Sequence, residues 1–423
     1  MLLKVWYIYL KEVKIGGICV SVKSLERRNS TMDIIRIFAA FSVVAVHFFL
    51  NSGFYEETCK GWIMYIMCVL RTFFSVCIPL FMILTGYLMC KKTLCKKYYV
   101  GIVKILLIYL FASVGCALFC NEYYHTSFTL NNFIFGLFNY SMAPYSWYIE
   151  LYIGLFLIIP FLNLIYNNLN SKRKKKVLLL TLFAVTVLPS VFNIFNFTGS
   201  TFWFSPEVSY TTKIVPEWWK GIYPITYYFI GCYLNEYGLK AKNVTLIISL
   251  ILFVFAFGSF NFMRSYSATF ESGAFIDWGG FEPFFISIVL FELFRRIRAN
   301  KLPQPVRWVL WKTSNAALGI YLFSYIFDSY FYQKLSEKVE NVQDRFVYFV
   351  VMVLLVFVCS LALSLITNLI IRLIYEGCGV IKSVFVTIKD ENIQKGTPTE
   401  EKEEEKEEKK NKKEEQLPLY RKY

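Results

Sequence analysis

Apolar runs of helical length recur along most of the chain and constrain its fold more than any other feature of the sequence. Hydrophobic residues make up 56% of the 423 residues, and charged residues only 18%. A soluble domain of this length could not bury so much apolar surface. Because about 20 apolar residues in a helix cross the hydrocarbon core of a bilayer, these runs predict a chain that crosses a membrane repeatedly. The predicted fold class is all-α, a polytopic integral membrane bundle.

Ten segments qualify as predicted membrane spans. The stretch from Gly61 to Cys90 is too long for one crossing and contains Arg71, so we divide it into an interfacial piece near 61–70 and a span. The ten predicted spans cover residues 33–52, 72–90, 98–119, 145–167, 177–196, 220–236, 243–262, 283–297, 315–333 and 347–375.

Basic residues collect on alternate connections between these spans. Clusters of Lys and Arg precede the first span and follow the second, fourth, sixth and eighth, whereas the other connections hold few. Cytoplasmic loops of membrane proteins carry such an excess of Lys and Arg. The pattern predicts a multi-pass protein of the cell membrane with both termini in the cytosol. Because the +15 net charge comes from short clusters between apolar runs, it does not indicate a nucleic-acid partner.

The two ends of the chain are predicted to lie outside the membrane domain, which covers residues 28–376. Residues 1–27 mix apolar and charged side chains and form a cytosolic or interfacial lead-in. Residues 389–423 are a mixed-charge run with little to bury, which predicts a disordered cytosolic tail. Eleven cysteines without a CxxC pair and only two histidines argue against a metal site.

The first span carries two ionisable residues on one face. Arg36 and His47 are eleven positions apart, which leaves a net rotation of about 20° and a separation of roughly 16 Å along a helix. An ionisable side chain at bilayer depth is a functional-site hypothesis by default. The pair therefore predicts one functional stripe that reaches two depths of the membrane.

Other ionisable residues fall at the same two depths once the predicted topology is applied. The outer level has a base, a cation and carboxylates, which are the ingredients of acid–base chemistry on a hydroxyl: His47, Arg71, Glu150, Glu282 and Asp328. The cytosolic level is cationic and suits phosphate groups: Arg36, Lys96, Lys97, Lys104, Arg295 and Arg296.

Several motifs together resemble the membrane acyltransferase-3 family. Arg28 to Ile37 has the form R-N-x-x-x-D-I-x-R-I, and His47 completes an R-x10-H pattern with Arg36. The family's P-L-F-F-x-x-S-G-Y segment is similar to IPLFMILTGYLM, with Thr85 in place of the usual Ser. Three further segments, in family order, extend the resemblance over residues 28–375: SWYIELYIGLFLIIPFLN from Ser146, YYFIGCYL from Tyr227 and ALGIYLF from Ala317.

The resemblance implies an integral-membrane O-acyltransferase. Such a protein moves an acyl group, usually acetyl, from cytosolic acyl-CoA to a hydroxyl of a glycan or lipid-linked sugar at the cell surface. The family requires the Arg and His of its R-x10-H pattern, which are Arg36 and His47 here. Many members have a His after the G-I-Y-L segment, where this chain has Ser324.

The residues and the resemblance together predict a mechanism. His47 acts as a general base on the acceptor hydroxyl or accepts the acyl group transiently. Arg71 stabilises the oxyanion or orients the acceptor, and Glu150 holds the tautomer of His47. The nucleotide of the acyl-CoA donor is held by cations of the cytosolic level: Arg36, Lys96, Lys97, Lys104 and Arg295.

Other interpretations of these residues remain open at this point. Arg36 and Arg71 could each extend to the headgroups as membrane-interface residues. A transporter or flippase of polysaccharide units, with His47 and Glu150 relaying protons, also fits repeated spans with intramembrane charge. A non-catalytic membrane sensor or assembly partner is the third class, favoured if Ser324 marks lost activity. Consumption of acetyl-CoA by the purified protein separates the enzyme from both.

Overall fold

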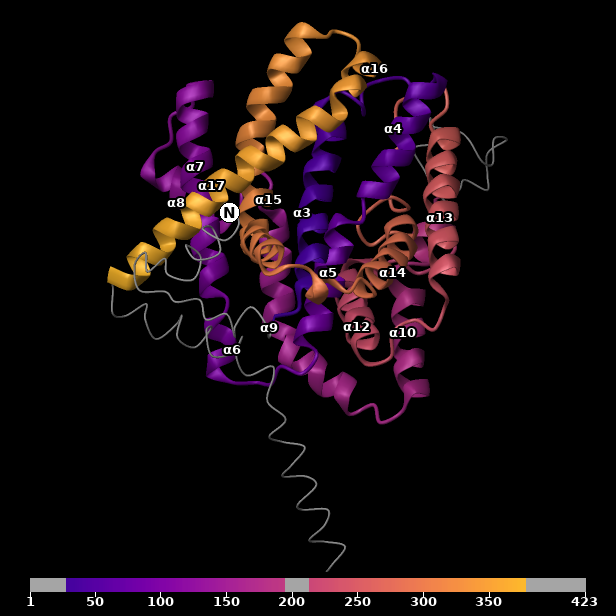
Figure 1. The fold of residues 1–423 in the computed structure, drawn as a ribbon. Helices are drawn as coiled ribbons and strands as arrows, with labels where there is room; N and C mark the ends of the chain where they lie inside the picture. The colour runs from indigo at the N-terminus through magenta and orange to yellow at the C-terminus, as the bar shows by residue number, and fades with distance from the viewer. Residues whose placement is uncertain (1–27, 195–212, 378–423) are drawn as a thin grey trace, which may run out of the picture. The chain divides into compact units, whose positions relative to one another are not determined.

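The computed structural model describes residues 28–194 and 213–377, and within these ranges the regular structure is helical throughout, which confirms the predicted fold class. The predicted lead-in over 1–27 and the tail over 389–423 lie outside the described residues. The longer helices, drawn in Figure 1, are α3 (Ser30–Asn51), α4 (Gly61–Phe74), α5 (Cys77–Met89), α7 (Val103–Tyr124), α9 (Trp147–Asn167), α10 (Lys172–Thr186), α12 (Tyr223–Glu236), α13 (Asn243–Arg264), α14 (Phe281–Arg295), α15 (Gln304–Lys338) and α17 (Phe349–Gly377). Short helices connect them: α6 (Lys96–Val100), α8 (Leu130–Phe138), α11 (Pro189–Phe192), α16 (Val342–Arg345), and the 3-10 turns η1 (Lys220–Ile222), η2 (Ala299–Lys301) and η3 (Phe346–Tyr348).

Seven helical segments of the described chain are long and apolar enough to cross a membrane, so the predicted number of ten is not confirmed by this criterion. The three remaining predicted spans correspond to α12, α14 and α15. Helices α12 and α14 have only 14 and 15 residues. Helix α15 has 35 residues, but polar and charged side chains interrupt it. The seven qualifying segments are 30–51, 61–89, 96–124, 147–167, 172–192, 243–264 and 342–374.

The break within the second apolar stretch lies later than predicted. Helix α4 continues through Arg71 to Phe74, and α5 begins at Cys77. Pro79 stands in the first turn of α5, where its lack of an N–H is tolerated, whereas an unbroken helix would place its ring against the carbonyl of Ser75. The Ser75 hydroxyl donates to the Thr72 carbonyl at 2.7 Å, which stabilises the end of α4.

Helix α3 lies in the middle of the bundle and packs against α15, α5, α17 and α4 (Figure 1). Its N-terminus is fixed by side chains. Asn29 caps the Thr31 N–H at 3.1 Å, and the Thr31 hydroxyl donates to the Ile297 carbonyl at 2.8 Å. The Ser30 N–H donates to Asn300 Oδ1 at 2.8 Å. These bonds hold the depth and rotation of the helix that carries Arg36 and His47.

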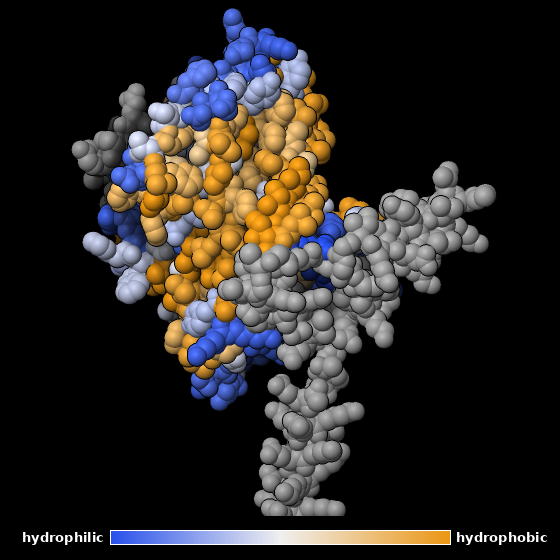
Figure 2. Space-filling model, turned by 90° about the vertical axis from the view of Figure 1, so that its left-hand side faces the viewer, coloured by the Kyte–Doolittle hydropathy of each residue, from blue (hydrophilic) through white to orange (hydrophobic). Residues whose placement is uncertain are grey.

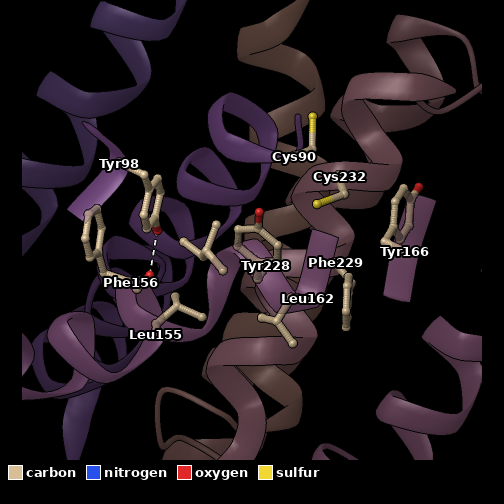
Figure 3. Packing of buried hydrophobic residues seen from close by; sticks show 10 residues of the cluster. Cys90, Tyr98, Leu155, Phe156, Leu162, Tyr166, Tyr228, Phe229 and Cys232 are labelled. Carbon is tan, nitrogen blue, oxygen red and sulfur yellow. Dashed lines mark hydrogen bonds between the residues drawn. The ribbon is translucent and has the colours of Figure 1, made fainter. Parts of the chain in front are cut away.

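Helices α5 and α12 touch through their backbones. A Cβ atom on Gly86 would lie 1.9 Å from the Tyr228 carbonyl oxygen, and one on Gly231 would lie 2.1 Å from the Ile83 carbonyl oxygen. Beside this contact, α12 and α9 share an apolar cluster, shown in Figure 3, in which Tyr98 stacks on Phe156 with ring centroids 4.4 Å apart. The segments IPLFMILTGYLM and YYFIGCYL, which are far apart in the sequence, are thus packed directly together.

The connections between helices gather at two ends that differ in charge. Figure 2 shows a broad band of hydrophobic residues with hydrophilic residues above and below it, as a membrane protein requires. The basic end comprises the connections 90–95, 168–171, 237–242 and 296–303; Asn163 donates there to the Met89 and Lys92 carbonyls. The other end, which we call the rim end, comprises 52–60, 265–280 and 339–348; there Arg345 donates to the Ser52 carbonyl at 2.9 Å.

Candidate active site

His47 is buried near the rim end of α3 and is held by two residues of α15. Its Nδ1 lies 3.0 Å from Asp328 Oδ2 and 3.2 Å from Ser324 Oγ. Ser324 and Asp328 are four residues apart, so they lie on one face of the helix. Because Ser324 donates its own hydroxyl proton to the Tyr321 carbonyl at 2.8 Å, it faces His47 as an acceptor.

This arrangement selects one tautomer of the neutral imidazole. Both neighbours of Nδ1 accept hydrogen bonds, so the network assigns the ring proton to Nδ1 and leaves the lone pair on Nε2. The ring is further fixed by Tyr145, whose ring centroid lies 3.9 Å from that of His47. Asn51 donates to the Tyr145 hydroxyl at 3.2 Å and to the His47 carbonyl at 2.8 Å. The result is an oriented imidazole with a basic nitrogen, which is what proton abstraction requires.

Arg71 lies in a buried polar network. Its Nη1 is 3.2 Å from Glu282 Oε1, and its Nε donates to the Tyr55 hydroxyl at 3.2 Å. Glu282 is completely buried, and it also accepts from Ser75 at 3.2 Å and from Asn261. The Arg71 side chain is itself only 8% exposed, so it does not extend to the headgroups. A buried ion pair with its remaining lone pairs satisfied holds this cation in one place.

His47 and Arg71 line the same cavity, which has a volume of about 460 Å³. The inner wall is apolar apart from Tyr321 and includes Val43, Cys77 and Ile78. The side toward the rim end is lined by aromatic and polar residues: Tyr55, Glu56, Tyr145, Trp147, Ser272 and Trp278. A concave site with a few convergent polar groups is the form expected for a small-molecule site.

The loops around the rim end are tied to one another. The Cys59 N–H donates to the Ala268 carbonyl at 2.8 Å, and the Ser267 N–H donates to the Cys59 carbonyl at 3.1 Å. Arg264 pairs with Glu271, with Nε 3.2 Å from Oε2. Burial raises the pKa of Glu271 above the ordinary value of a carboxyl group, and Arg264 opposes that rise. The loop carrying Ser272 and Trp278 is therefore anchored at both the backbone and the side-chain level.

The structure places Asp328, and not Glu150, beside His47. Glu150 is exposed in the first turn of α9 and is not among the cavity-lining residues. The predicted role of Glu150 in holding the tautomer is corrected, because Asp328 occupies the position beside Nδ1.

The predicted donor-binding residues lie apart from the cavity lining. Arg36 donates from Nη1 to Ser314 Oγ at 2.7 Å and lies 3.6 Å from Asp33, with its side chain 28% exposed. Arg295 forms two bonds with the buried Glu292, at 2.7 and 2.8 Å. Lys96 is exposed, whereas Lys97 and Lys104 are half-buried. Arg36 and His47 thus contact α15 at two separate depths, through Ser314 and through Ser324 with Asp328.

Tyr145, Trp278 and Glu56 line the cavity and were not predicted from the sequence as site residues. Asp328 was placed only at the depth of His47. The sequence did contain a signal for Asp328. It follows Ser324, which stands where the family often has a His, by four residues, so both lie on one face of a helix. Trp278 and Glu56 lie in connections between helices, and no periodic pattern marks them.

Comparison with known proteins identifies the family. The profile of a family described as an acyltransferase domain matches residues 29–365, which is most of the chain and includes α3, the cavity and α15. No curated protein and no solved structure gives a significant match. The motifs around Arg36 and His47, their placement on one helix and this match lead to one conclusion: the chain is a membrane acyltransferase and belongs to the acyltransferase-3 family.

Proposed function

We propose that this protein is an O-acyltransferase that moves an acetyl group from acyl-CoA to a hydroxyl of a glycan or lipid-linked sugar. The observation that carries the proposal is the contact of His47 Nδ1 with Asp328 at 3.0 Å, in a cavity shared with Arg71. That contact leaves Nε2 as the nitrogen able to act on a ligand. The same logic of base and orienting carboxylate operates in enzymes that activate a hydroxyl.

Each step of the transfer has a residue to perform it. His47 Nε2 takes the proton of the acceptor hydroxyl as the oxygen attacks the carbonyl carbon of the thioester. Arg71 stabilises the negative charge on the tetrahedral intermediate. Collapse of the intermediate breaks the carbon–sulfur bond, and the CoA thiolate takes the proton back from the imidazolium. If His47 instead accepts the acyl group first, Nε2 attacks the thioester carbonyl, the carbon–sulfur bond breaks and CoA leaves as the thiolate. The acceptor hydroxyl then attacks the acyl group on the ring, its proton passes to the CoA thiolate, and Nε2 is released while Asp328 keeps the ring proton on Nδ1.

The donor enters from the basic end in this proposal. Arg36 is partly exposed, which suits contact with a phosphate of the CoA nucleotide, and other cations of the basic end add to the attraction. The roughly 16 Å between Arg36 and His47 along α3 suits a long pantetheine arm. By the positive-inside rule the basic end faces the cytosol of a cell membrane, with both termini on that side, and the rim end faces outward.

Purified full-length protein with acetyl-CoA labelled in the acetyl group tests the proposal. We expect release of CoA and formation of a labelled ester on the acceptor, and loss of both in His47→Ala. The matched control is His125→Asn, because His125 is the other histidine, exposed at the end of α7 with a φ of +54° that Asn tolerates. Activity that survives in His47→Ala would contradict the proposed mechanism.

The cellular counterpart of this assay measures ester-linked acyl groups on surface glycan. Cells that lack the protein should lose one class of these esters, and the wild-type chain, but not His47→Ala, should restore it. A transporter or flippase would change the amount of exported glycan and leave its degree of acylation unaltered. Unchanged glycan esters in the deletion strain would refute a glycan acceptor.

A further inference from the structure

Two tryptophans form an aromatic surface beside the mouth of the cavity. Trp147 begins α9, and Trp278 lies in the loop that precedes α14. Their rings are nearly parallel, with centroids 6.0 Å apart and an interplanar angle of 17°. Trp147 is 38% exposed, which is high for a residue that also lines a cavity. The side chains of Glu56 and Ser272, both exposed, supply hydrogen-bonding groups on the same lining.

This surface is preformed. The Trp278 carbonyl accepts a bond of 2.8 Å from Tyr227, a buried residue of α12. Just before Trp147, Ser146 donates to the Tyr140 carbonyl at 2.6 Å and fixes the start of α9. Because the loop is already ordered, a ligand that stacks on the tryptophans loses little binding free energy to loop ordering.

Carboxyl groups outnumber cations in and behind the cavity. Glu56 lines it, Glu282 lies behind Arg71, and Asp328 lies behind His47. Arg71 and a protonated His47 would together offset only two of these three. Two further pairs at the rim end balance each other, Arg264 with Glu271 at 3.2 Å and Lys220 with Asp277 at 4.0 Å. The excess negative charge would repel an anionic ligand and so exclude it from the cavity.

We propose that Trp147, Trp278 and Glu56 form the acceptor subsite and select a neutral or cationic hydroxylated ring over an acidic one. A pyranose has an apolar C–H face that suits an indole ring and hydroxyl groups that can donate to a carboxylate. With the ring on the tryptophans, a further hydroxyl points inward to His47. The inference rests on the proposed function for the transfer step, whereas ring binding and charge selection can be measured without it.

Three methyl glycosides that share one ring provide the probe: methyl glucoside, methyl glucosaminide and methyl glucuronide. Saturation-transfer NMR measures the binding of each glycoside to full-length His47→Ala in detergent, and so reports recognition without turnover. We expect the glucoside and the glucosaminide to bind and the glucuronide to bind at least about tenfold more weakly. Glu56→Gln should narrow that difference.

Substitutions of the tryptophans test the stacking surface. In the His47→Ala background, Trp147→Ala and Trp278→Ala should each raise the Kd for the methyl glucoside about tenfold. In the otherwise wild-type protein, each should raise the KM for the acceptor by a similar factor and leave kcat at saturating acceptor little changed. Trp147→Phe, which keeps an aromatic face, should recover most of the loss. The matched control is Trp218→Ala, because Trp218 is 95% exposed and does not line the cavity.

The outcomes separate this inference from the proposed function. Equal binding of the three glycosides, or wild-type affinity in both alanine variants, would overturn the subsite even if ester is formed. Selective binding without any ester formation in the wild type would uphold the subsite and refute the transferase mechanism.

Discussion

At the scale of single residues, the site depends on how the two nitrogens of His47 are divided. Asp328 and Ser324 both accept from Nδ1 of His47, so Nδ1 is occupied and only Nε2 can act on a ligand. Their roles differ in strength. The bond to a carboxylate is charge-assisted and, in the proposed mechanism, stabilises the imidazolium of the transition state, whereas the bond to a hydroxyl is neutral. Ser324 therefore supplements Asp328, and its presence in place of a family His is compatible with activity.

Replacing Asp328 should damage turnover without preventing substrate binding. In Asp328→Asn the amide can present an N–H to Nδ1 and favour the wrong tautomer, so we expect kcat to fall by on the order of 10²- to 10⁴-fold at an almost unchanged acceptor KM. Ser324→Ala should cost less than about tenfold, since one neutral hydrogen bond is lost. Asp344→Asn, an exposed position near the rim end, serves as the control. Near-normal kcat in Asp328→Asn would exclude the orienting role.

Arg71 holds the buried Glu282 in an ion pair, and the proposed mechanism adds a chemical role that two variants separate from this structural one. Arg71→Met leaves Glu282 buried without its cation, which should destabilise the protein by roughly 3–5 kcal/mol. The double variant Arg71→Met with Glu282→Gln removes that buried charge and should recover much of the lost thermal stability. Acyl transfer should remain low in both variants, because neither has a cation for the oxyanion. Recovery of activity together with stability would assign Arg71 a structural role alone.

At the scale of helices, Gly86 and Gly231 permit the backbones of α5 and α12 to touch. Both glycines lie inside helices, where replacement by Ala is intrinsically favourable by about 1 kcal/mol. The added Cβ would meet a backbone carbonyl at 1.9 or 2.1 Å, so the helices must separate. That separation would disturb the packing of α5, whose first turn, with Cys77 and Ile78, forms part of the cavity wall.

Gly86→Ala and Gly231→Ala should each lower the melting temperature of the detergent-solubilised protein, because overpacking costs typically about 1–3 kcal/mol and outweighs the helix propensity. Gly154→Ala is the matched control. Gly154 lies in α9 with no atom within 4 Å of an added Cβ, so this variant should be as stable as the wild type or slightly more stable. Equal melting temperatures for all three variants would show that the α5–α12 contact is not limiting.

At the scale of the whole described bundle, the difference in charge between its ends predicts its orientation. Cys95 is exposed at the basic end, and it serves as a natural reporter. In intact cells a membrane-impermeant maleimide should leave Cys95 unlabelled until the membrane is permeabilised. In a Cys95→Ser background, Ser272→Cys at the rim end should be labelled without permeabilisation. The reverse pattern would invert the orientation and place the cavity mouth in the cytosol.

The sequence by itself determined the class of the fold and the family, and it singled out His47 and Arg71, which the structure places in one cavity. Long apolar runs require helices in a membrane, the basic clusters mark one end, and the spacing of Arg36 and His47 places both on one stripe of α3. These properties are local, because each depends on residues within one segment or on the composition of a connection. The position of Arg71 at the depth of His47 also followed from counting along the chain.

Only the tertiary structure decided which side chains meet. Depth alone did not distinguish Glu150 from Asp328, because both fall at the level of His47; the rotation of α15 against α3 brings Asp328 to Nδ1, while Glu150 is exposed on α9. Helices α12 and α14 are short and α15 contains polar and charged side chains, so hydropathy alone does not show which residues of these helices meet their neighbours. The rim residues Glu56 and Trp278 belong to loops, whose positions are set by hydrogen bonds between distant segments such as Cys59 and Ala268.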